Sequence, residues 1–304
     1  MRRLSKCVLT LVLFMNFQFA AAAAADGKFY IVGMGTAPDL ITLRGVEAIK
    51  SADIILLEEP SEKIYWSEFI GDKEVWYCPH GSRVGFGIDL EKVRDSDVRA
   101  ILQRNARQRQ ETVDKIKAAV AQGKIVASLQ GGDAMIYGTT FYLEMLPEGF
   151  PSEIIPGIGA IQAASAAVKM SPVYGYDTNS VIVTMDDWPG RKDVNEKLMA
   201  TRTSMVFYTM NMNYPRLFEK LNRHYPPSTP VAVVSYAGDR QKQRVVKSTV
   251  GQFMEDIDYK KLAADAHLLM VGKFLTVGQA RYDALIGADD DDIDRVHGAT
   301  PTAK

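Results

Sequence analysis

Short apolar segments alternate with helical patterns through the first half of the chain, and this alternation limits its possible folds more than any other feature. The segments typical of buried strands are 28–35, 53–59, 74–80, 124–130 and 152–157. Between them the apolar residues follow helical spacing, in 39–52, 62–70, 90–122, 141–149 and 160–169. Strict alternation of strand and helix favours a mainly parallel sheet with helices on both faces.

The second half has a different pattern. A polar, turn-rich stretch at 171–180 indicates a linker, and five further strand candidates follow at 180–185, 204–210, 230–238, 244–250 and 267–275. A clear helix is expected at 214–225, but helices are fewer than in the first half, which favours a mixed sheet. We therefore expect a two-domain α/β protein: an N-terminal α/β domain at 27–170 and a C-terminal α/β domain at 178–287. The end of the chain, 288–304, has four adjacent aspartates and is expected to be a disordered acidic tail.

Composition excludes several classes of protein. The chain is 47% hydrophobic and 24% charged, which is ordinary globular usage. Its net charge is -1, so it lacks the surplus of Lys and Arg with which proteins bind nucleic acid. No nucleic-acid partner is expected.

The first 25 residues are typical of a secretory signal peptide. A basic start, "MRRLSK", precedes the apolar run "CVLTLVLFMNF" and a row of alanines before Asp26. The run is short for a permanent span, which needs about 20 residues. We expect an exported protein, periplasmic or secreted, with no stable membrane span after cleavage; the alternatives are an uncleaved anchor or, without a signal, a cytoplasmic protein. Cleavage would leave Cys78 as the one cysteine, which rules out an internal disulfide and a cysteine-based metal site.

The segment "LQGGDAMIYGTT" contains the strongest local signal for a binding site. Gly131, Gly132 and Asp133 follow directly after a predicted strand, at the end where open α/β sheets bind ligands. Glycines allow main chain to approach a ligand closely. The alternative is structural: Asp133 as the N-cap of the next helix, worth about 1 kcal/mol.

Other candidate positions permit two interpretations each. Gly33 and Gly35 in "VGMGTAPDL" form either a ligand loop or a tight turn, and the small-residue helix after "IIPG" either approaches a ligand or packs on the sheet. Glu58 and Glu59 end the second predicted strand. They act either as a general base or as solvated acids at the start of a helix. His80 is a loop histidine for which a structural or solvated role is favoured over catalysis. The histidines lack metal-ligand spacing, and no serine or cysteine has the context of a nucleophile.

The order of the motifs resembles the tetrapyrrole methylase family. The segments concerned are "VGMGTAPDLITLRGVEAIKSADIIL", "GGDAMIYG", "IIPGIGAIQAASAA", "VFYTMN" and "DRQKQRVV", with "LLMVGKF" at the end, and they extend over about 28–287. The run "YGTTFYLEML" is most similar to the precorrin-2 methylase branch. The resemblance implies an S-adenosylmethionine-dependent C-methyltransferase that acts on a uroporphyrinogen-like or precorrin-like tetrapyrrole. It also implies two α/β domains with the cofactor at their junction, and a homodimer.

The resemblance also implies roles for individual residues. Positions expected to contact S-adenosylmethionine are Gly131, Gly132, Asp133, Ile136, Gly159, Ala160, Thr209, Met210 and Gly238. Glu58 falls where relatives have an acid that accepts a proton, because methylation of a ring carbon leaves a proton to be lost. A sulfonium methyl is already activated, so the protein's main contribution would be to orient donor and acceptor.

Departures from the family pattern keep other functions open. The first loop is one residue shorter than the usual G-x-G-P-G-D-P, and Ala134 replaces the proline that usually follows Gly-Gly-Asp. Pro79 and His80 stand near the position where some relatives have a lysine proton donor. Export is also unusual for an enzyme that uses a cytoplasmic cofactor. The alternatives are therefore an exported, non-catalytic relative that binds a tetrapyrrole or another ligand in the same trough, and a plain α/β nucleotide-binding protein.

Overall fold

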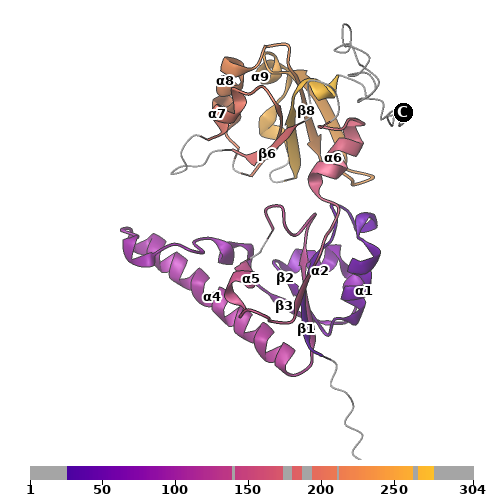
Figure 1. Ribbon diagram of the computed structural model, residues 1–304, viewed down its shortest axis with the longest axis vertical. Coiled ribbons are helices and arrows are strands. Elements are labelled where there is room, and N and C mark those ends of the chain that lie inside the picture. Colours follow the sequence, from indigo (N-terminus) through magenta and orange to yellow (C-terminus); the bar gives the residue numbers. More distant parts are fainter. Residues whose placement is uncertain are drawn as a thin grey trace, which may run out of the picture.

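The computed structural model describes residues 26–138, 141–173, 180–186, 194–210, 212–262 and 266–276. The expected signal peptide and acidic tail, and most of the expected linker, lie outside the described residues. The described chain forms two lobes, one above the other along the long axis in Figure 1, and each is built on its own five-stranded sheet.

The sheet of the first lobe is parallel throughout. Its strands are β1 (Lys28–Gly33), β2 (Ile54–Leu57), β3 (Glu74–Tyr77), β4 (Ile125–Gln130) and β5 (Ser152–Ile155). They lie in the order β3-β2-β4-β1-β5. The parallel sheet that the alternating pattern predicts is therefore confirmed. Because all five strands run in one direction, their carboxyl ends, and the loops that follow them, gather at the same edge.

Helices cover both faces of this sheet, so its central strands are apolar on both sides. The helices are α1 (Leu43–Ser51), α2 (Pro60–Tyr65), α3 (Ser67–Ile70), α4 (Ser96–Ala121) and α5 (Phe141–Met145), with 3-10 turns at Pro38–Leu40, His80–Arg83 and Leu90–Lys92. Along β2, Ile54 packs with the α4 and α5 side while Ile55 packs with the α1 side. This alternation is the period of two that a strand imposes on its side chains.

The long helix α4 begins later than the sequence pattern indicates. A helix is expected over 90–122, but a short 3-10 turn occupies 90–92 and the α-helix starts at Ser96. The Asp95 side chain accepts hydrogen bonds from the backbone N–H groups of Asp97 and Val98, both at 2.9 Å. This N-cap satisfies donors that the first turn leaves without partners, and it therefore determines where the helix begins.

The second lobe contains a mixed sheet, as predicted. Its strands are β6 (Val181–Met185), β7 (Ser204–Tyr208), β8 (Pro230–Ser235), β9 (Arg244–Thr249) and β10 (His267–Val271), in the order β6-β7-β10-β8-β9. The β6–β7 pair is parallel and the other pairs are antiparallel. The remaining elements are α7 (Asn195–Met199), α8 (Tyr214–His224), α9 (Phe253–Asp256) and 3-10 turns at Tyr259–Lys261 and Lys273–Leu275.

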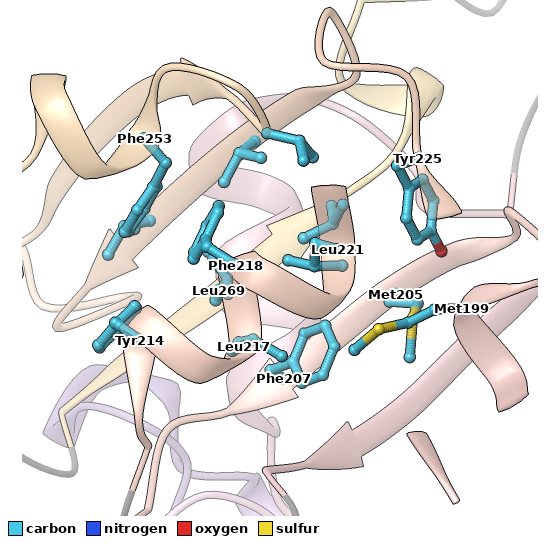
Figure 2. Packing of buried hydrophobic residues seen from close by; sticks show 14 of the residues in the cluster. Met199, Met205, Phe207, Tyr214, Leu217, Phe218, Leu221, Tyr225, Phe253 and Leu269 are labelled. Carbon is cyan, nitrogen blue, oxygen red and sulfur yellow. The ribbon is translucent and has the colours of Figure 1, made fainter. Parts of the chain in front are cut away.

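The main core of this lobe lies under α8 (Figure 2). Leu217, Phe218 and Leu221 are at most 1% exposed and pack from α8 toward the strands. The ring of Phe218 stacks on Phe253 of α9 at 3.8 Å between centroids. The apolar face of one helix is thus buried by a sheet and a second helix, as amphipathic spacing requires.

Helix α6 (Ala160–Val168) packs on the second sheet, although the sequence pattern assigns it to the first domain. Ala163, Ala164 and Val168 are buried against residues of β8 and β10, such as Ala232 and Met270. Figure 1 shows α6 with the upper lobe. Alternation along the chain predicts that a helix follows β5, but it contains no information on which sheet the helix covers. The small residues of α6 allow it to pack closely on the second sheet, which agrees with the packing interpretation of this helix.

Among the described residues, no helix is both long and apolar enough to cross a membrane, and no three His, Cys, Asp or Glu side chains gather in a way that could bind a metal ion.

Candidate active site

A cleft of about 1540 Å³ is lined by residues of both lobes. The first lobe contributes the loop after β1, helix α2, the 80–84 segment and the turn after β4. The second lobe contributes the ends of β7 and β8 and the beginning of β10, and Ala160 at the start of α6 also lines the cleft. The cleft therefore lies at the carboxyl edge of the parallel sheet, where binding sites in open α/β folds are expected.

Glycines bring three strand ends of the first lobe together at this edge. Gly35 and Gly132 form an isolated bridge, with N···O distances of 3.1 and 2.8 Å. A Cβ on Gly157 would lie 2.2 Å from the carbonyl oxygen of Gly132, and one on Gly33 would lie 2.4 Å from the nitrogen of Gly157. Such separations are well below van der Waals contact, so Gly33 and Gly157 are required for close backbone packing.

Gly131 and Gly132 differ from that group, because their missing side chains leave open space. A Cβ at either position would have no heavy atom within 4 Å, and both residues line the cleft. Gly132 has φ +72°, in the left-handed region that glycine adopts without strain. The structure thus presents bare main chain to the cleft at the positions that the sequence predicts.

Asp133 stabilises the turn that contains these glycines. Its Oδ1 accepts a hydrogen bond from the Met135 N–H at 2.8 Å, and its Oδ2 accepts one from the Gly157 N–H at 3.2 Å. The next described helix, α5, starts at Phe141, so Asp133 is not its N-cap. The carboxylate instead joins the loops after β4 and β5, and the residue lines the cleft.

The other predicted cofactor contacts divide into two groups. Ile136, Ala160, Thr209 and Met210 line the cleft. Gly159 and Gly238 do not belong to that lining. Gly159 is the N-cap residue of α6. A Cβ on Gly238 would lie 2.6 Å from Leu40 Cδ1 and from Thr36 Oγ1, so this glycine permits close contact between the two lobes.

Glu58, the predicted proton acceptor, lies behind the cleft surface and pairs with His80. The His80 Nδ1 lies 2.7 Å from Glu58 Oε2, and the Arg83 guanidinium contacts His80 Nε2. A carboxylate only accepts and a guanidinium only donates, so in this arrangement Nδ1 donates to Glu58 and Nε2 accepts from Arg83. His80 and Arg83 line the cleft, whereas Glu58 does not.

The sequence favours a structural or solvated role for His80, and the structure places this residue in the cleft beside the expected acid. The sequence shows that Glu58 and His80 each follow a predicted strand, but it does not show that these two strands are neighbours. Glu58 follows β2 and His80 follows β3, and these strands are neighbours in the sheet, so their ends meet. Strand order is a tertiary property that one sequence does not reveal.

Glu59 and Glu62 begin helix α2, which supports the helix-start interpretation of Glu59. The Glu62 Oε2 accepts hydrogen bonds from the backbone N–H of Glu58 at 2.7 Å and of Glu59 at 3.1 Å. With the Glu59 side chain this forms a capping box. Burial raises the pKa of the Glu62 carboxyl, which lines the cleft.

Sequence reasoning missed Arg109, a buried residue of α4 that supports the 80–84 segment. Its side chain is buried at 6% exposure and donates hydrogen bonds to the carbonyl oxygens of Ser82 and Val84, the second at 3.2 Å. The guanidinium also lies 5.4 Å from the centre of the Phe86 ring. Burial lowers the pKa of this guanidinium. Arg109 thereby fixes the backbone that presents His80 and Arg83 to the cleft.

Tyrosines from both lobes complete the cleft region. Tyr208 and Tyr236 line it from the second lobe, and Tyr65 lines it from α2. Tyr137, from the turn after β4, makes an edge contact with Tyr208 at 4.9 Å between ring centroids. Tyr137 and Tyr236 have φ values of 60° and 49°, which are uncommon for residues with a side chain and which occur preferentially at functional sites.

Comparison with known proteins identifies the family. The family model "Tetrapyrrole (Corrin/Porphyrin) Methylases" matches residues 28–253. A uroporphyrinogen-III C-methyltransferase of Methanocaldococcus jannaschii is 28% identical over 83% of this chain and 98% of its own length. A cobalt-precorrin-4 C(11)-methyltransferase of the same organism is 27% identical over 85% of this chain and 92% of its own.

Solved structures agree on the fold. A cobalt precorrin-4 methyltransferase superposes with a TM-score of 0.61 at 22% identity, covering 82% of this chain and 96% of the other. A uroporphyrin-III C-methyltransferase from Thermus thermophilus, complexed with S-adenosyl homocysteine, has a TM-score of 0.57 at 18% identity, covering 82% and 99%. The predicted two-domain α/β fold is confirmed. The chain belongs to the tetrapyrrole (corrin/porphyrin) methylase family and is, as its motif order indicated, an S-adenosylmethionine-dependent methyltransferase.

Proposed function

We propose that this protein transfers the methyl group of S-adenosylmethionine to a carbon atom of a uroporphyrinogen-like or precorrin-like tetrapyrrole. The observation that supports this most strongly is a single cleft in which the bare main chain of Gly131 and Gly132 and the imidazole of His80 are both exposed. The cleft volume of about 1540 Å³ exceeds the roughly 300–1,000 Å³ of a site for one small ligand. It is large enough for a methyl donor and an acceptor together.

The residues present fit S-adenosylmethionine. Gly131 and Gly132 leave room for a ligand against main chain. Thr36, which also lines the cleft, has a buried hydroxyl oxygen for which the described residues supply no hydrogen-bond partner. A buried hydroxyl is costly without a partner, so a polar group of a ligand would satisfy it. Thr209 and Met210 would hold the opposite side from the second lobe.

In the proposed mechanism, the cofactor supplies an activated methyl group on a sulfonium, and the protein orients the acceptor and removes a proton. Methylation of a ring carbon forms the new C–C bond and leaves a proton to be lost. We assign its acceptance to Nε2 of His80, with Glu58 holding the ring through Nδ1, an arrangement that stabilises the resulting imidazolium. Arg83 would leave Nε2 to bind an anionic substituent of the substrate.

Methyl transfer to uroporphyrinogen III and to precorrin-2, measured with methyl-labelled S-adenosylmethionine, tests this function. Label in the macrocycle is the expected result. Cofactor binding without transfer to any tetrapyrrole would instead favour the alternative of a non-catalytic relative, and absence of cofactor binding at millimolar concentration would contradict the proposal.

His80→Gln tests the proton acceptor. General-base catalysis contributes about 10²- to 10⁴-fold, so a loss of transfer rate in that range is expected while cofactor affinity is kept. Glu58→Gln should lower the rate in the same direction. His224→Gln is the matched control, because His224 ends α8 and pairs with Glu196 at 3.4 Å, outside the cleft. An unchanged rate in His80→Gln would exclude this residue as the base.

We also propose a homodimer and export from the cytoplasm. The dimer is supported by the family resemblance alone, and the mass of the purified protein in solution tests it. Export is supported by the signal-like pattern of 1–25. Cell fractionation and the N-terminal sequence of the mature protein test it, and intact protein found in the cytoplasm would contradict it.

A further inference from the structure

Strand β9 is a free edge of the second sheet. It pairs with β8 on one side and with no described strand on the other. Its first four residues, 244–247, are exposed, with Val245 at 36% and Val246 at 42%. Because successive residues of a strand point to opposite faces, these two valines show that the described residues leave β9 uncovered on both faces. Free edges with apolar side chains pair readily with other strands, so proteins usually cover them.

This edge also carries positive charge. Arg244 and Lys247 are exposed, and neither forms an ion pair with a described residue; Arg244 donates to two carbonyl oxygens of the preceding turn, at 3.2 and 2.7 Å. Arg244 lies on the same face of β9 as Val246, and Lys247 on the same face as Val245. Asp256 bonds to β9 near the far end of the strand, through a serine hydroxyl at 2.7 Å. The part of the edge at 244–247 therefore favours an anionic partner.

Segment 289–294 of the same chain has the charge that this edge favours. Its sequence, "DDDDID", has five aspartates and Ile293 in six residues, and it lies outside the described residues. In an extended conformation its aspartates point to both faces, as do the cations of β9, and Ile293 adds an apolar side chain for one of the valines. Extended segments join free sheet edges through main-chain hydrogen bonds, and side-chain contacts give the specificity.

The described chain leaves the second sheet close to β9. After β10, the N–H of Gly272 donates to the carbonyl oxygen of Pro230 at 3.0 Å, and Pro230 is opposite Thr249 in the β8–β9 pair. The last described residue, Thr276, follows four positions later. The 12 residues of 277–288 extend to at most about 40 Å, whereas the six residues of β9 span about 20 Å. Segment 289–294 can therefore reach every position along this edge.

We propose that segment 289–294 docks along the free edge of β9 as a further strand, with aspartates paired to Arg244 and Lys247, in place of the disordered tail that composition alone predicts. A second copy of β9 is a less favourable occupant, because antiparallel pairing centred on the valines would set Arg244 of each copy opposite a lysine of the other. Docking would cover the valines and block self-association through this edge. No residue of β9 lines the cleft, so the inference is independent of the proposed function.

Hydrogen exchange of the full chain, measured by mass spectrometry in peptides that contain 244–249, tests the docking. The variant Asp289→Asn/Asp290→Asn/Asp291→Asn/Asp292→Asn removes four charges and keeps the length of the segment. An exposed ion pair is worth up to about fivefold in an equilibrium constant, so loss of two pairs should speed exchange of the outward N–H groups of β9 by roughly 2- to 25-fold. Exchange of β6, the other edge of the same sheet, should not change.

A reciprocal variant checks that the contact is with β9. Arg244→Gln/Lys247→Gln removes the two cations at exposed positions, where the fold should tolerate the change. It should speed exchange of β9 to a similar extent, and the four asparagines should then have little further effect, because both sets of charges act through one contact. Arg104→Gln/Arg107→Gln is the matched control, because these arginines are exposed on α4 in the first lobe. It should leave exchange of β9 as in the wild type.

Two results would overturn the proposal. Equal exchange of β9 in the wild type and in the asparagine variant would show that segment 289–294 does not protect this edge. Protection that increases with protein concentration would show that another copy, rather than the same chain, occupies the edge.

Discussion

Two glycines near the cleft have opposite surroundings, and alanine substitution separates their roles. At Gly131 an added Cβ would meet no heavy atom within 4 Å, and the φ of this residue lies outside the left-handed region. At Gly157 the same Cβ would lie 2.2 Å from Gly132 O and 2.6 Å from the carbonyl carbon of Gly33. We expect Gly131→Ala to impair ligand binding alone and Gly157→Ala to impair folding as well.

The magnitudes follow from these distances. Gly131→Ala should leave the free energy of unfolding within about 0.5 kcal/mol of the wild type, or raise it by up to about 1 kcal/mol because alanine restricts the unfolded chain. If its methyl occupies space that the cofactor needs, the cost of about 1–3 kcal/mol corresponds to roughly 5- to 150-fold in Kd. In Gly157→Ala two strand ends must separate by about 1 Å to restore ordinary contact distances, which costs about 1–3 kcal/mol or more of stability.

Urea unfolding and calorimetric titration with S-adenosylhomocysteine measure both quantities on the same samples. The reasoning would be refuted by a Gly131→Ala variant that binds the ligand as the wild type does, because the bare main chain would then not be a contact surface. A Gly157→Ala variant of wild-type stability would refute the close packing of the three strand ends.

Three other substitutions test the supports of the site and the core. Arg109→Gln removes the buried guanidinium and its hydrogen bonds to the carbonyl oxygens of Ser82 and Val84. It is expected to destabilise the protein by about 2–4 kcal/mol and to slow methyl transfer, whereas Arg107→Gln, exposed on the same helix, should do neither. Burial raises the folded-state pKa of Glu62, so ionisation of this group opposes folding at high pH. Glu62→Gln should therefore gain stability relative to the wild type as the pH rises from about 4 to 8, in urea unfolding measured across that range, and a constant difference would contradict this. Phe218→Ala empties the stack on Phe253 and should cost about 3–5 kcal/mol in chemical unfolding; a cost below about 1 kcal/mol would show that this core can repack.

The sequence predicts the sheets of this protein well, because their signal is local. A strand such as β2 is a continuous apolar run of the kind that is buried on both faces, and a helix such as α8 repeats its apolar residues at helical spacing. The exact start of α4 is less evident, since it depends on the N-cap at Asp95. The assignment of α6 to the second sheet depends on packing between segments that are distant in the chain.

Part of the site is likewise visible in the sequence. The bare main chain at Gly131 and Gly132 lies at the end of a strand. This segment can be identified as a candidate binding site from its local sequence alone. The roles of Gly33 and Gly157 cannot be assigned from the sequence, because a glycine required for close packing and a glycine required for ligand contact look identical there.

The sequence alone determined the two α/β domains, the family and the glycine segment that faces the cleft. Only the tertiary structure decided which residues meet there: His80 with Glu58 through the pairing of β2 and β3, Arg109 beneath the 80–84 segment, and Tyr137 with Tyr208 across the two lobes. The physical reason is the separation along the chain of the residues that interact. Periodicity and turn chemistry arise between near neighbours in the chain, whereas acid–base pairs and aromatic contacts arise from strand order and lobe packing, which bring together residues separated by many positions.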